Sequence, residues 1–135
     1  MSKLQTQFID QIQAVPAAEW NAITGTAYPF IRHEFLAAME LSGSVSPEAG
    51  WTPSHLIIRD NRDNLAAVMP CYVKEDSYGE FVFDWSWANA YHQHGMPYYP
   101  KLLTAIPFTP CVGPRLLISP EQDRNEITQL AVDAI

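Results

Sequence analysis

Apolar residues at helical spacing predict two helices in the first third of the chain. Four of them recur within one stretch: Ile31, Phe35, Ala38 and Met39. They predict a helix from Pro29 to Leu41, with Gly43 as its C-cap. A shorter helix is expected before it, with Pro16 at its first position and Gly25 at its end. The stretch from Leu4 to Ile12 fits both helical spacing and strand alternation, and we favour a short strand.

The last segment carries the signals of a helix start but none of a helix end. Ser119 stands at the N-cap position of a capping box, with Pro120 at the first helical position and Gln122 at the third. The apolar face of this helix consists of Ile127, Leu130, Ala131 and Ala134. Because no stop signal precedes Ile135, we expect the N-terminal part of a longer protein, truncated within a C-terminal helix.

The middle of the chain predicts a β-hairpin. Ser54 to Arg59 and Leu65 to Val73 are the expected strands, and residues 60–64 between them have turn chemistry. Pro70 cannot donate a ladder hydrogen bond, which implies a bulge or an edge at that point. A third strand is expected from Tyr78 to Phe83. Three sequential strands favour an antiparallel meander over a doubly wound parallel sheet.

Residues 84–114 are rich in aromatic residues and proline. We expect one short helix there, Trp87 to His94, followed by loops and by a strand near Arg115 to Ile118. Together these elements predict an α/β fold that leans to α+β. We expect one domain over residues 1–135, since no linker, repeat or charge run divides the sequence.

The composition narrows the class of protein. Of the 135 residues 47% are hydrophobic and 17% charged, which is typical of a folded globular chain. The net charge of −7, with eight scattered basic residues, disfavours binding of DNA or RNA. No apolar run approaches the roughly 20 residues of a membrane span, and no secretory signal follows Met1, so we expect a cytoplasmic protein. Cys71 and Cys111 are interpreted as small apolar residues rather than as a disulfide.

The strand expected at residues 78–83 carries the first candidate catalytic pair. Glu80 and Tyr78 would point to the same side of a regular strand. They could then act as base and acid in acyl transfer to an amine, which requires both. The alternative is that Tyr78 packs while Glu80 faces solvent, and strand alternation by itself favours this alternative.

His92 and His94 are further candidates for the base, and Tyr91 for the acid. Two imidazoles on one face would also suit a metal ion. Zinc sites need three or four ligands, however, and no third ligand stands at a recognisable spacing. We therefore expect no metal site, and hydrogen-bonded histidines are the alternative to a catalytic role.

Rigid aromatic segments supply the candidate substrate-binding residues. The candidates are Tyr91, Tyr98, Tyr99, Lys101, Thr109 and Arg115. Such segments line a pocket or pack over a sheet edge, and the sequence leaves both alternatives open. The planar guanidinium of Arg115 could bind a carboxylate or phosphate, or it could form a structural ion pair.

The six glycines lie too far apart to form a phosphate cradle. Neither Gly-x-Gly-x-x-Gly nor a P-loop is present, so no dinucleotide or nucleoside triphosphate is indicated. The segment Gln/Arg-x-x-Gly-x-Gly/Ala, with which acetyltransferases of the GNAT superfamily hold the coenzyme A pyrophosphate, is also missing. We therefore expect no cofactor bound by this chain itself.

Several strings extend over roughly residues 15–120. They are Pro29–Leu36, Glu40 followed by Ser42–Val45, Gly50–Pro53, Ser77–Ala88, Tyr98–Leu102, Pro107–Pro110 and Gly113–Leu117. In this order they resemble the N-terminal part of the bacterial FemAB-like N-acyltransferases of the GNAT superfamily. Strings of this length in this order are specific.

The resemblance implies a GNAT-like fold, a mixed sheet with an antiparallel front flanked by helices. It also implies transfer of an acyl or aminoacyl group to the amine of a small molecule or peptide. Fem enzymes use aminoacyl-tRNA to build peptidoglycan cross-bridges, whereas ordinary GNAT members use acyl-CoA, so either is a candidate donor. Family members are longer than this chain, and the donor site is expected in the missing C-terminal half. No catalytic residue is carried over from the family.

The missing phosphate cradle motivates a second hypothesis, a non-catalytic domain that binds substrate or mediates dimerisation. Such a domain would expose an apolar sheet face that a C-terminal half or a second copy covers. Homo-oligomers are therefore the expected state of the isolated chain.

Overall fold

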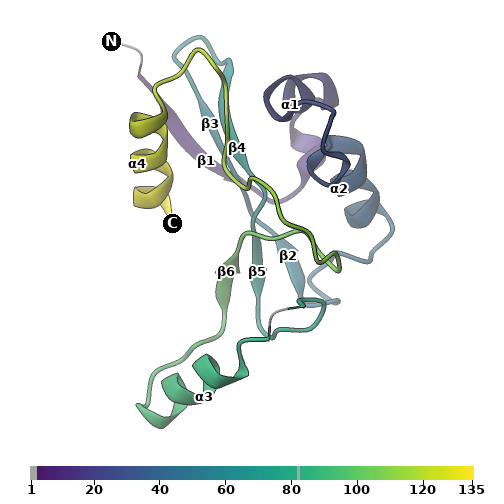
Figure 1. Ribbon diagram of the computed structural model, residues 1–135, viewed down its shortest axis with the longest axis vertical. Helices are drawn as coiled ribbons and strands as arrows, with labels where there is room; N and C mark the ends of the chain where they lie inside the picture. Colours follow the sequence, from purple (N-terminus) through teal and green to yellow (C-terminus); the bar gives the residue numbers. More distant parts are fainter. Residues whose placement is uncertain (1–2, 82) are drawn as a thin grey trace.

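The structure is a computed structural model that describes residues 3–81 and 83–135. These residues form an α+β fold with four α-helices, two short 3₁₀ helices and two antiparallel sheets (Figure 1). The α+β leaning is confirmed. The single mixed sheet is not found within the described ranges, because every strand pair in them is antiparallel.

The first sheet has four strands. In spatial order they are β1 (Gln5–Ile9), β3 (His55–Arg59), β4 (Leu65–Met69) and β7 (Leu117–Ile118). The short N-terminal strand, the hairpin of β3 and β4, and the late strand all agree with the sequence. Both central strands are buried on their two faces, which explains their nearly continuous apolar sequences.

The second sheet has three short strands. In spatial order they are β2 (Trp51–Pro53), β5 (Tyr72–Lys74) and β6 (Lys101–Leu103). The sequence predicted loops where β6 lies, and that prediction was wrong. No strand was predicted at β2. Strands of three residues are too short for alternation to reveal them.

One long hairpin belongs to both sheets. β2 runs on into β3 and β4 runs on into β5, with a bend at Ser54 on one strand and at Pro70 on the other. The backbone N–H of Ser54 donates to the carbonyl of Cys71 at 2.9 Å across this bend. Pro70 has no N–H to continue the ladder, so the chain changes sheets there. The sequence predicted a bulge or an edge at Pro70, and the structure has there the point at which the chain passes from one sheet to the other.

A buried histidine fixes the bend of this hairpin. The backbone N–H of Cys71 donates to Nδ1 of His55 at 3.1 Å, so the proton of the neutral ring lies on Nε2. Nε2 donates in turn to Oε2 of Glu40 at 2.8 Å. The other oxygen of Glu40 accepts from the backbone N–H of Ile12 at 2.9 Å. His55 thus links the bend to the helical segments that contain Ile12 and Glu40, and it has a structural role.

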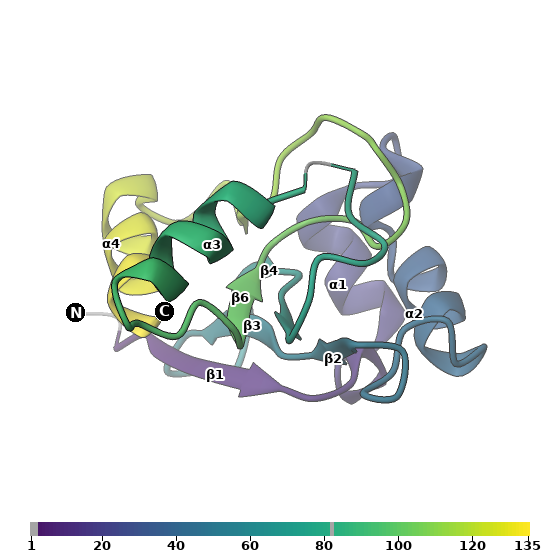
Figure 2. The ribbon, with the colours of Figure 1, turned by 90° about the horizontal axis from the view of Figure 1, so that it is seen from below.

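Helices α1 (Ala17–Thr24) and α2 (His33–Leu41) cover one face of the first sheet (Figures 1 and 2). The largest apolar cluster lies beneath them and includes Trp20, Leu36, Ile57 and Val68. The predicted helix at Pro29–Leu41 begins later than expected. Pro29–Ile31 is a separate 3₁₀ turn, and Arg32 is extended before α2 starts. Pro16 is the N-cap of α1 rather than its first residue.

Helix α4 (Arg124–Ala134) packs on the opposite face. Its Ile127 and Ala131 contact the strand residues Leu56, Ile58, Ala67 and Met69 through two smaller clusters. Neighbouring strand residues point to opposite faces, so Ile57 contacts α1 and α2 while Ile58 contacts α4. The apolar face predicted for this helix is confirmed, but its predicted start is not.

The N-cap of α4 is Asp123, whose Oδ1 accepts from the backbone N–H of Glu126 at 2.9 Å. Ser119 instead begins a turn closed by the N–H of Gln122. Replacing Asp123 by alanine should therefore lower the free energy of unfolding by about 1 kcal/mol, the usual value of an N-cap. Ser119→Ala is the matched control and should have a much smaller effect in urea unfolding. Equal losses from both variants would contradict this cap.

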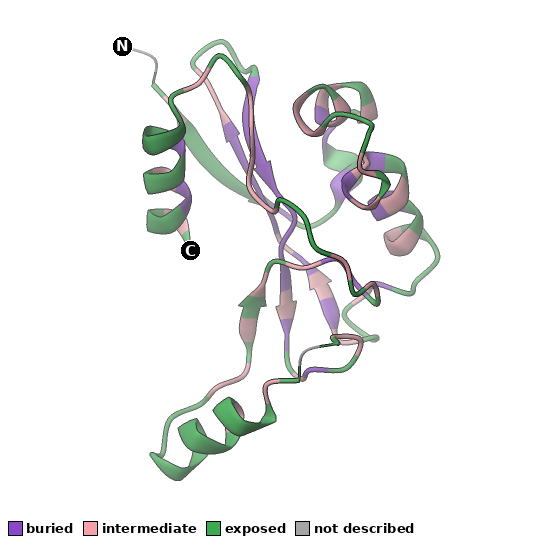
Figure 3. Cartoon of the chain, viewed as in Figure 1, coloured by how far each residue is buried: buried purple, intermediate pink, exposed green. Residues whose placement is uncertain are grey.

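Helix α3 (Trp85–Gln93) projects from the second sheet and contains no buried residue (Figure 3). It agrees closely with the helix predicted at Trp87–His94. The third strand predicted at residues 78–83 is wrong for its described part, because residues 78 and 79 form a turn. Val82 lies outside the described residues. The sequence after β5 therefore leaves the sheet to build a turn and a protruding helix.

Candidate functional site

A cavity of about 590 Å³ lies between the second sheet and the segment that follows β6. Its walls are largely apolar and include Trp51, Phe81, Leu102, Leu103, Ile106 and Val112. The polar residues in its lining are Glu80, Asp84, Tyr98, Lys101, Thr109 and Arg115. The volume and the few polar groups are those of a small-molecule site.

A buried cluster of charges contributes to the lining of this cavity. Nζ of Lys101 donates to Oε1 of Glu80 at 2.8 Å and also to Oδ2 of Asp84. Tyr98 and Tyr99 donate their hydroxyls to the two oxygens of Asp84, at 2.7 and 2.9 Å. The side chains of Glu80, Asp84 and Lys101 are 8%, 14% and 13% exposed. Two carboxylates and one ammonium are therefore held together largely away from water.

The second oxygen of Glu80 has no hydrogen-bond partner in the described part of the chain. Nζ of Lys74 lies 3.9 Å from it. Lys74 is fully buried, and its Nζ lies 4.1 Å from the centre of the Trp51 ring, a cation–π contact. Oε2 of Glu80 is thus a buried acceptor beside a positive charge, with its hydrogen-bonding capacity unused.

The surroundings shift the protonation of these groups. Burial raises the pKa of Asp84, but hydrogen bonds from Lys101, Tyr98 and Tyr99 outweigh it, so the pKa lies below its usual value. Burial lowers the pKa of Lys101, and the hydrogen bonds to Asp84 and Glu80 reverse that effect, so the net pKa is raised. The hydrogen bond to Asp84 raises the pKa of Tyr98 to about 12. Lys101 is consequently cationic, and Tyr98 neutral, near pH 7.

Lys74 behaves differently from Lys101. Burial lowers its pKa, and the attraction of Asp76 and Glu80 offsets only part of that effect. Its ammonium donates to the backbone carbonyl of Tyr78 at 2.5 Å. Lys74 therefore anchors the turn that carries Glu80 and does not reach the cavity.

The turn at residues 77–80 places Glu80 inside the cluster and Tyr78 outside it. The N–H of Glu80 donates to the carbonyl of Ser77 at 3.2 Å, and Nε1 of Trp51 donates to the carbonyl of Tyr78 at 3.0 Å. The Tyr78 residue is 75% exposed, whereas the side chain of Glu80 is buried. Both sequence interpretations of this pair had assumed a strand, and the turn reverses the expected burial.

Gly79 allows this turn to lie against the aromatic wall. Its φ is +81°, and a Cβ there would be 2.6 Å from Cε1 of Phe108 and 2.7 Å from Nε1 of Trp51. We expect Gly79→Ala to lower the free energy of unfolding by about 2–3 kcal/mol, from the left-handed backbone and the overpacking. Gly43→Ala is the control, because Gly43 has a φ of +80° and open space around it. Chemical unfolding should show a loss of about 1 kcal/mol in the free energy of unfolding for that control. Equal losses in the two variants would argue against the tight packing at Gly79.

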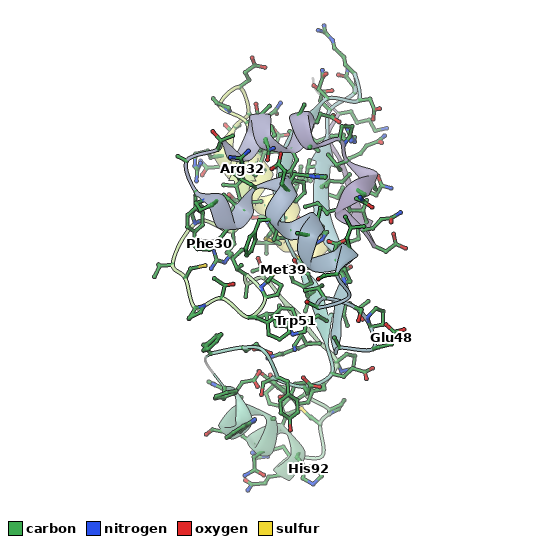
Figure 4. The ribbon with its side chains drawn as sticks, turned by 90° about the vertical axis from the view of Figure 1, so that its right-hand side faces the viewer. Phe30, Arg32, Met39, Glu48, Trp51 and His92 are labelled. Atoms are coloured by element: carbon green, nitrogen blue, oxygen red, sulfur yellow. The ribbon has the colours of Figure 1, made fainter. Side chains whose placement is uncertain are left out.

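Of the candidates on α3 and at its C-cap, Tyr91 contacts the charged cluster through Tyr98, and the two histidines, His92 and His94, are exposed. His92 lies at the far end of the molecule from the helical layer, with Trp51 between them (Figure 4). The ring of Tyr91 packs edge-on against Tyr98 at 5.1 Å between centroids. No three His, Cys, Asp or Glu side chains in residues 3–81 and 83–135 are grouped to hold a metal ion.

The last two candidates, Thr109 and Arg115, also line the cavity. Thr109 donates its hydroxyl to the carbonyl of Pro107 at 2.9 Å. The guanidinium of Arg115 donates to the carbonyl of Cys111 at 2.9 Å and to that of Gly113 at 3.1 Å. Arg115 therefore holds its own loop together, and no ion pair with it is found among the described residues.

Three residues of the site were not identified from the sequence: Lys74, Asp84 and Trp51. Lys74 follows Tyr72 by two positions, so both point to one face of β5, and the aromatic neighbour could have indicated burial. Asp84 stands in the string Ser77–Ala88, but nothing local links it to Lys101. The structure brings Glu80, Tyr98, Tyr99 and Lys101 together with these three residues.

The two cysteines are free. Cys71 is buried, and burial raises the pKa of its thiol to about 11, so it is not a nucleophile at neutral pH. Among the helices described, none has the length and apolar character needed to cross a bilayer.

Comparison with known proteins gives one match. A FemAB-like family model, described as peptidoglycan biosynthesis/recognition, matches residues 11–135. No curated protein matches the chain significantly. No solved structure does so either. The match includes every element from the first 3₁₀ helix to α4, and with them the cavity and its charged cluster.

Proposed function

Because the chain belongs to the FemAB-like family, whose members are concerned in general with peptidoglycan-related aminoacyl transfer, we propose that it takes part in transferring an acyl or aminoacyl group to an amine. The acceptor in this proposal is the amine of a small molecule or peptide. The donor is an aminoacyl-tRNA or an acyl-CoA, both of which are cytoplasmic. The antiparallel arrangement of β1, β3 and β4 supports a GNAT-like architecture.

The observation that carries the proposal is the charged cluster in the lining of a largely apolar cavity. An amine is protonated at neutral pH and must lose a proton before or during its attack on a carbonyl. Glu80 is one of the residues that line that cavity, and its buried Oε2 is a carboxylate oxygen without a hydrogen-bond partner among the described residues. The positive charge of Lys101 lies on the other side of the same carboxylate.

The reaction needs no covalent enzyme intermediate. The amine nitrogen attacks the donor carbonyl carbon and a C–N bond forms. The ammonium loses one proton to water before the attack. As the C–N bond forms, a second proton passes from the nitrogen to Glu80, the bond from the carbonyl carbon to the donor oxygen or sulfur breaks, and Glu80 gives that proton to the leaving oxygen or sulfur. Lys101 would stabilise negative charge on the tetrahedral intermediate. Asp84 would position Lys101, because it holds the ammonium together with Tyr98 and Tyr99.

A transfer assay tests this proposal. The chain is incubated with a labelled acyl-CoA or a charged tRNA and with a panel of amines, including lysine-containing peptides. Formation of a labelled amide that depends on the chain supports the proposal. The absence of transfer from both donor classes, with correctly folded protein, would remove it.

The exposed helix α3 favours a second candidate, a non-catalytic role in binding or self-association. Trp85 and Trp87 on this helix are 64% and 67% exposed, and Phe83 stacks on Trp85 at 4.8 Å between ring centroids. A surface of this kind is typical of an interaction site. Sedimentation equilibrium distinguishes the candidates: a dimer lost in a Trp85→Ser, Trp87→Ser variant, without transfer activity in either protein, favours the second.

A further inference from the structure

We propose that the cavity binds the apolar part of the transferred group, and that this group is a hydrophobic acyl rather than a small or polar one. The inference rests on the proposed transfer and specifies its substrate class. Trp51, Leu102, Leu103 and Ile106 are among the apolar residues of the wall, and the charged side chains in the lining are Glu80, Asp84, Lys101 and Arg115. The carbonyl of the acyl group would lie toward Glu80 and Lys101, and its chain along the apolar wall.

The size of the cavity supports a bulky group. Its volume of about 590 Å³ lies within the range of roughly 300–1,000 Å³ found for small-molecule sites. A glycyl or acetyl group would leave most of the apolar wall without a partner. A longer alkyl or aryl chain would bury that wall and gain the free energy of removing both surfaces from water.

The chemistry of the wall favours the acyl group over the acceptor as occupant. A peptide acceptor carries an N–H and a C=O at every residue, and apolar walls would leave them without hydrogen bonds. A simple acyl chain has only one polar group, the carbonyl that reacts, and an aminoacyl group adds only the α-amine next to that carbonyl. The polar groups in the lining are few, and two of them, Glu80 and Lys101, are joined to each other.

Ala105 offers a way to shorten the cavity. It lines the wall just after β6 and precedes the buried Ile106. Leucine at this position adds three carbon atoms to the wall. The optimum length of a bound chain should therefore fall by about three carbons in Ala105→Leu. Ala18→Leu is the matched control, because Ala18 lies on the exposed side of α1 and not in the cavity.

The first experiment measures binding without any reaction. A series of straight-chain primary amides, from acetamide to octanamide, is titrated into the full chain by calorimetry. Each added methylene should tighten binding about fourfold until the cavity is filled, since burial of one methylene contributes about 0.8 kcal/mol. A dissociation constant that does not change with chain length overturns the inference. Binding that tightens with chain length for n-alkylamines but not for the amides also overturns the inference, because the cavity would then bind the acceptor amine and not the acyl group.

The second experiment compares donors in the transfer assay, with acetyl-CoA against octanoyl-CoA and glycyl-tRNA against leucyl- or phenylalanyl-tRNA. The bulkier donor should have the higher kcat/KM in the native chain, and Ala105→Leu should lose this advantage while Ala18→Leu keeps it. Transfer that prefers the small donors overturns the inference and leaves the proposed function standing. Amide binding that depends on chain length, found without any transfer, overturns the proposed function and leaves the apolar specificity of the cavity standing.

Discussion

Replacement of Lys101 by methionine is expected to lower the free energy of unfolding by about 3–5 kcal/mol at neutral pH. Lys101 is the cation shared by Glu80 and Asp84, and all three side chains are largely buried. Methionine fills a similar volume but leaves two buried carboxylates without their common partner. Urea unfolding of both proteins at pH 7 measures the loss.

The pH dependence of this loss identifies its cause. The folded-state pKa of Asp84 lies below its unfolded value, so its ionisation contributes stability above that unfolded value and the contribution disappears as the pH falls. The native chain and Lys101→Met should therefore converge below about pH 4, where carboxyl groups become protonated. Adding Asp84→Asn to Lys101→Met should recover part of the loss at pH 7. A loss that is constant with pH would mean that packing, not charge, is responsible.

Glu80→Gln is expected to lower the rate of acyl transfer by about 10²–10⁴-fold, the usual contribution of a general base. Glutamine keeps the size of the side chain and can still accept from Lys101, but its amide does not take a proton. The rate constant for a single turnover, measured with saturating donor, reports the chemical step.

Two controls separate catalysis from folding in this experiment. Glu48→Gln changes an exposed carboxylate outside the cavity and should leave the rate unchanged. Circular dichroism and the urea midpoint show whether Glu80→Gln is folded at the assay temperature. A folded Glu80→Gln variant with the native rate would remove Glu80 as the base, and transfer itself would then need another proton acceptor.

The elements that local signals specify were predicted well. The hairpin of β3 and β4 follows from two apolar runs around the turn at residues 60–64, and the side chain of Asp60 accepts from the N–H groups of Arg62 and Asn64 there. Helix α3 and the apolar face of α4 follow from residue spacing. The cap of α4 shows how far local signals can predict a helix start. Ser119 and Asp123 are both good N-cap residues, so residue type alone does not decide between them.

The site was predicted only in part, because its residues meet through tertiary structure. Glu80 and Lys101 are 21 positions apart and become neighbours when β6 pairs with β5. Three-residue strands give no sequence pattern that would have indicated this pairing. The burial of Glu80 depends on a turn whose conformation requires Gly79 against Trp51 and Phe108. The aromatic and charged residues of this region were identified as candidates for the site. The strand alternation assumed for residues 78–83, however, gave the wrong orientation for Tyr78 and Glu80.

The hairpin shared by the two sheets restricts how this protein can vary in evolution. A recombination point between residues 54 and 71 would cut strands that serve both sheets at once, so neither sheet can be exchanged as a separate module. Insertions meet less resistance at the turn of residues 60–64 and at the exposed end of α3, where few packed contacts would be broken. Variation in chain length among descendants should therefore accumulate at those two tips.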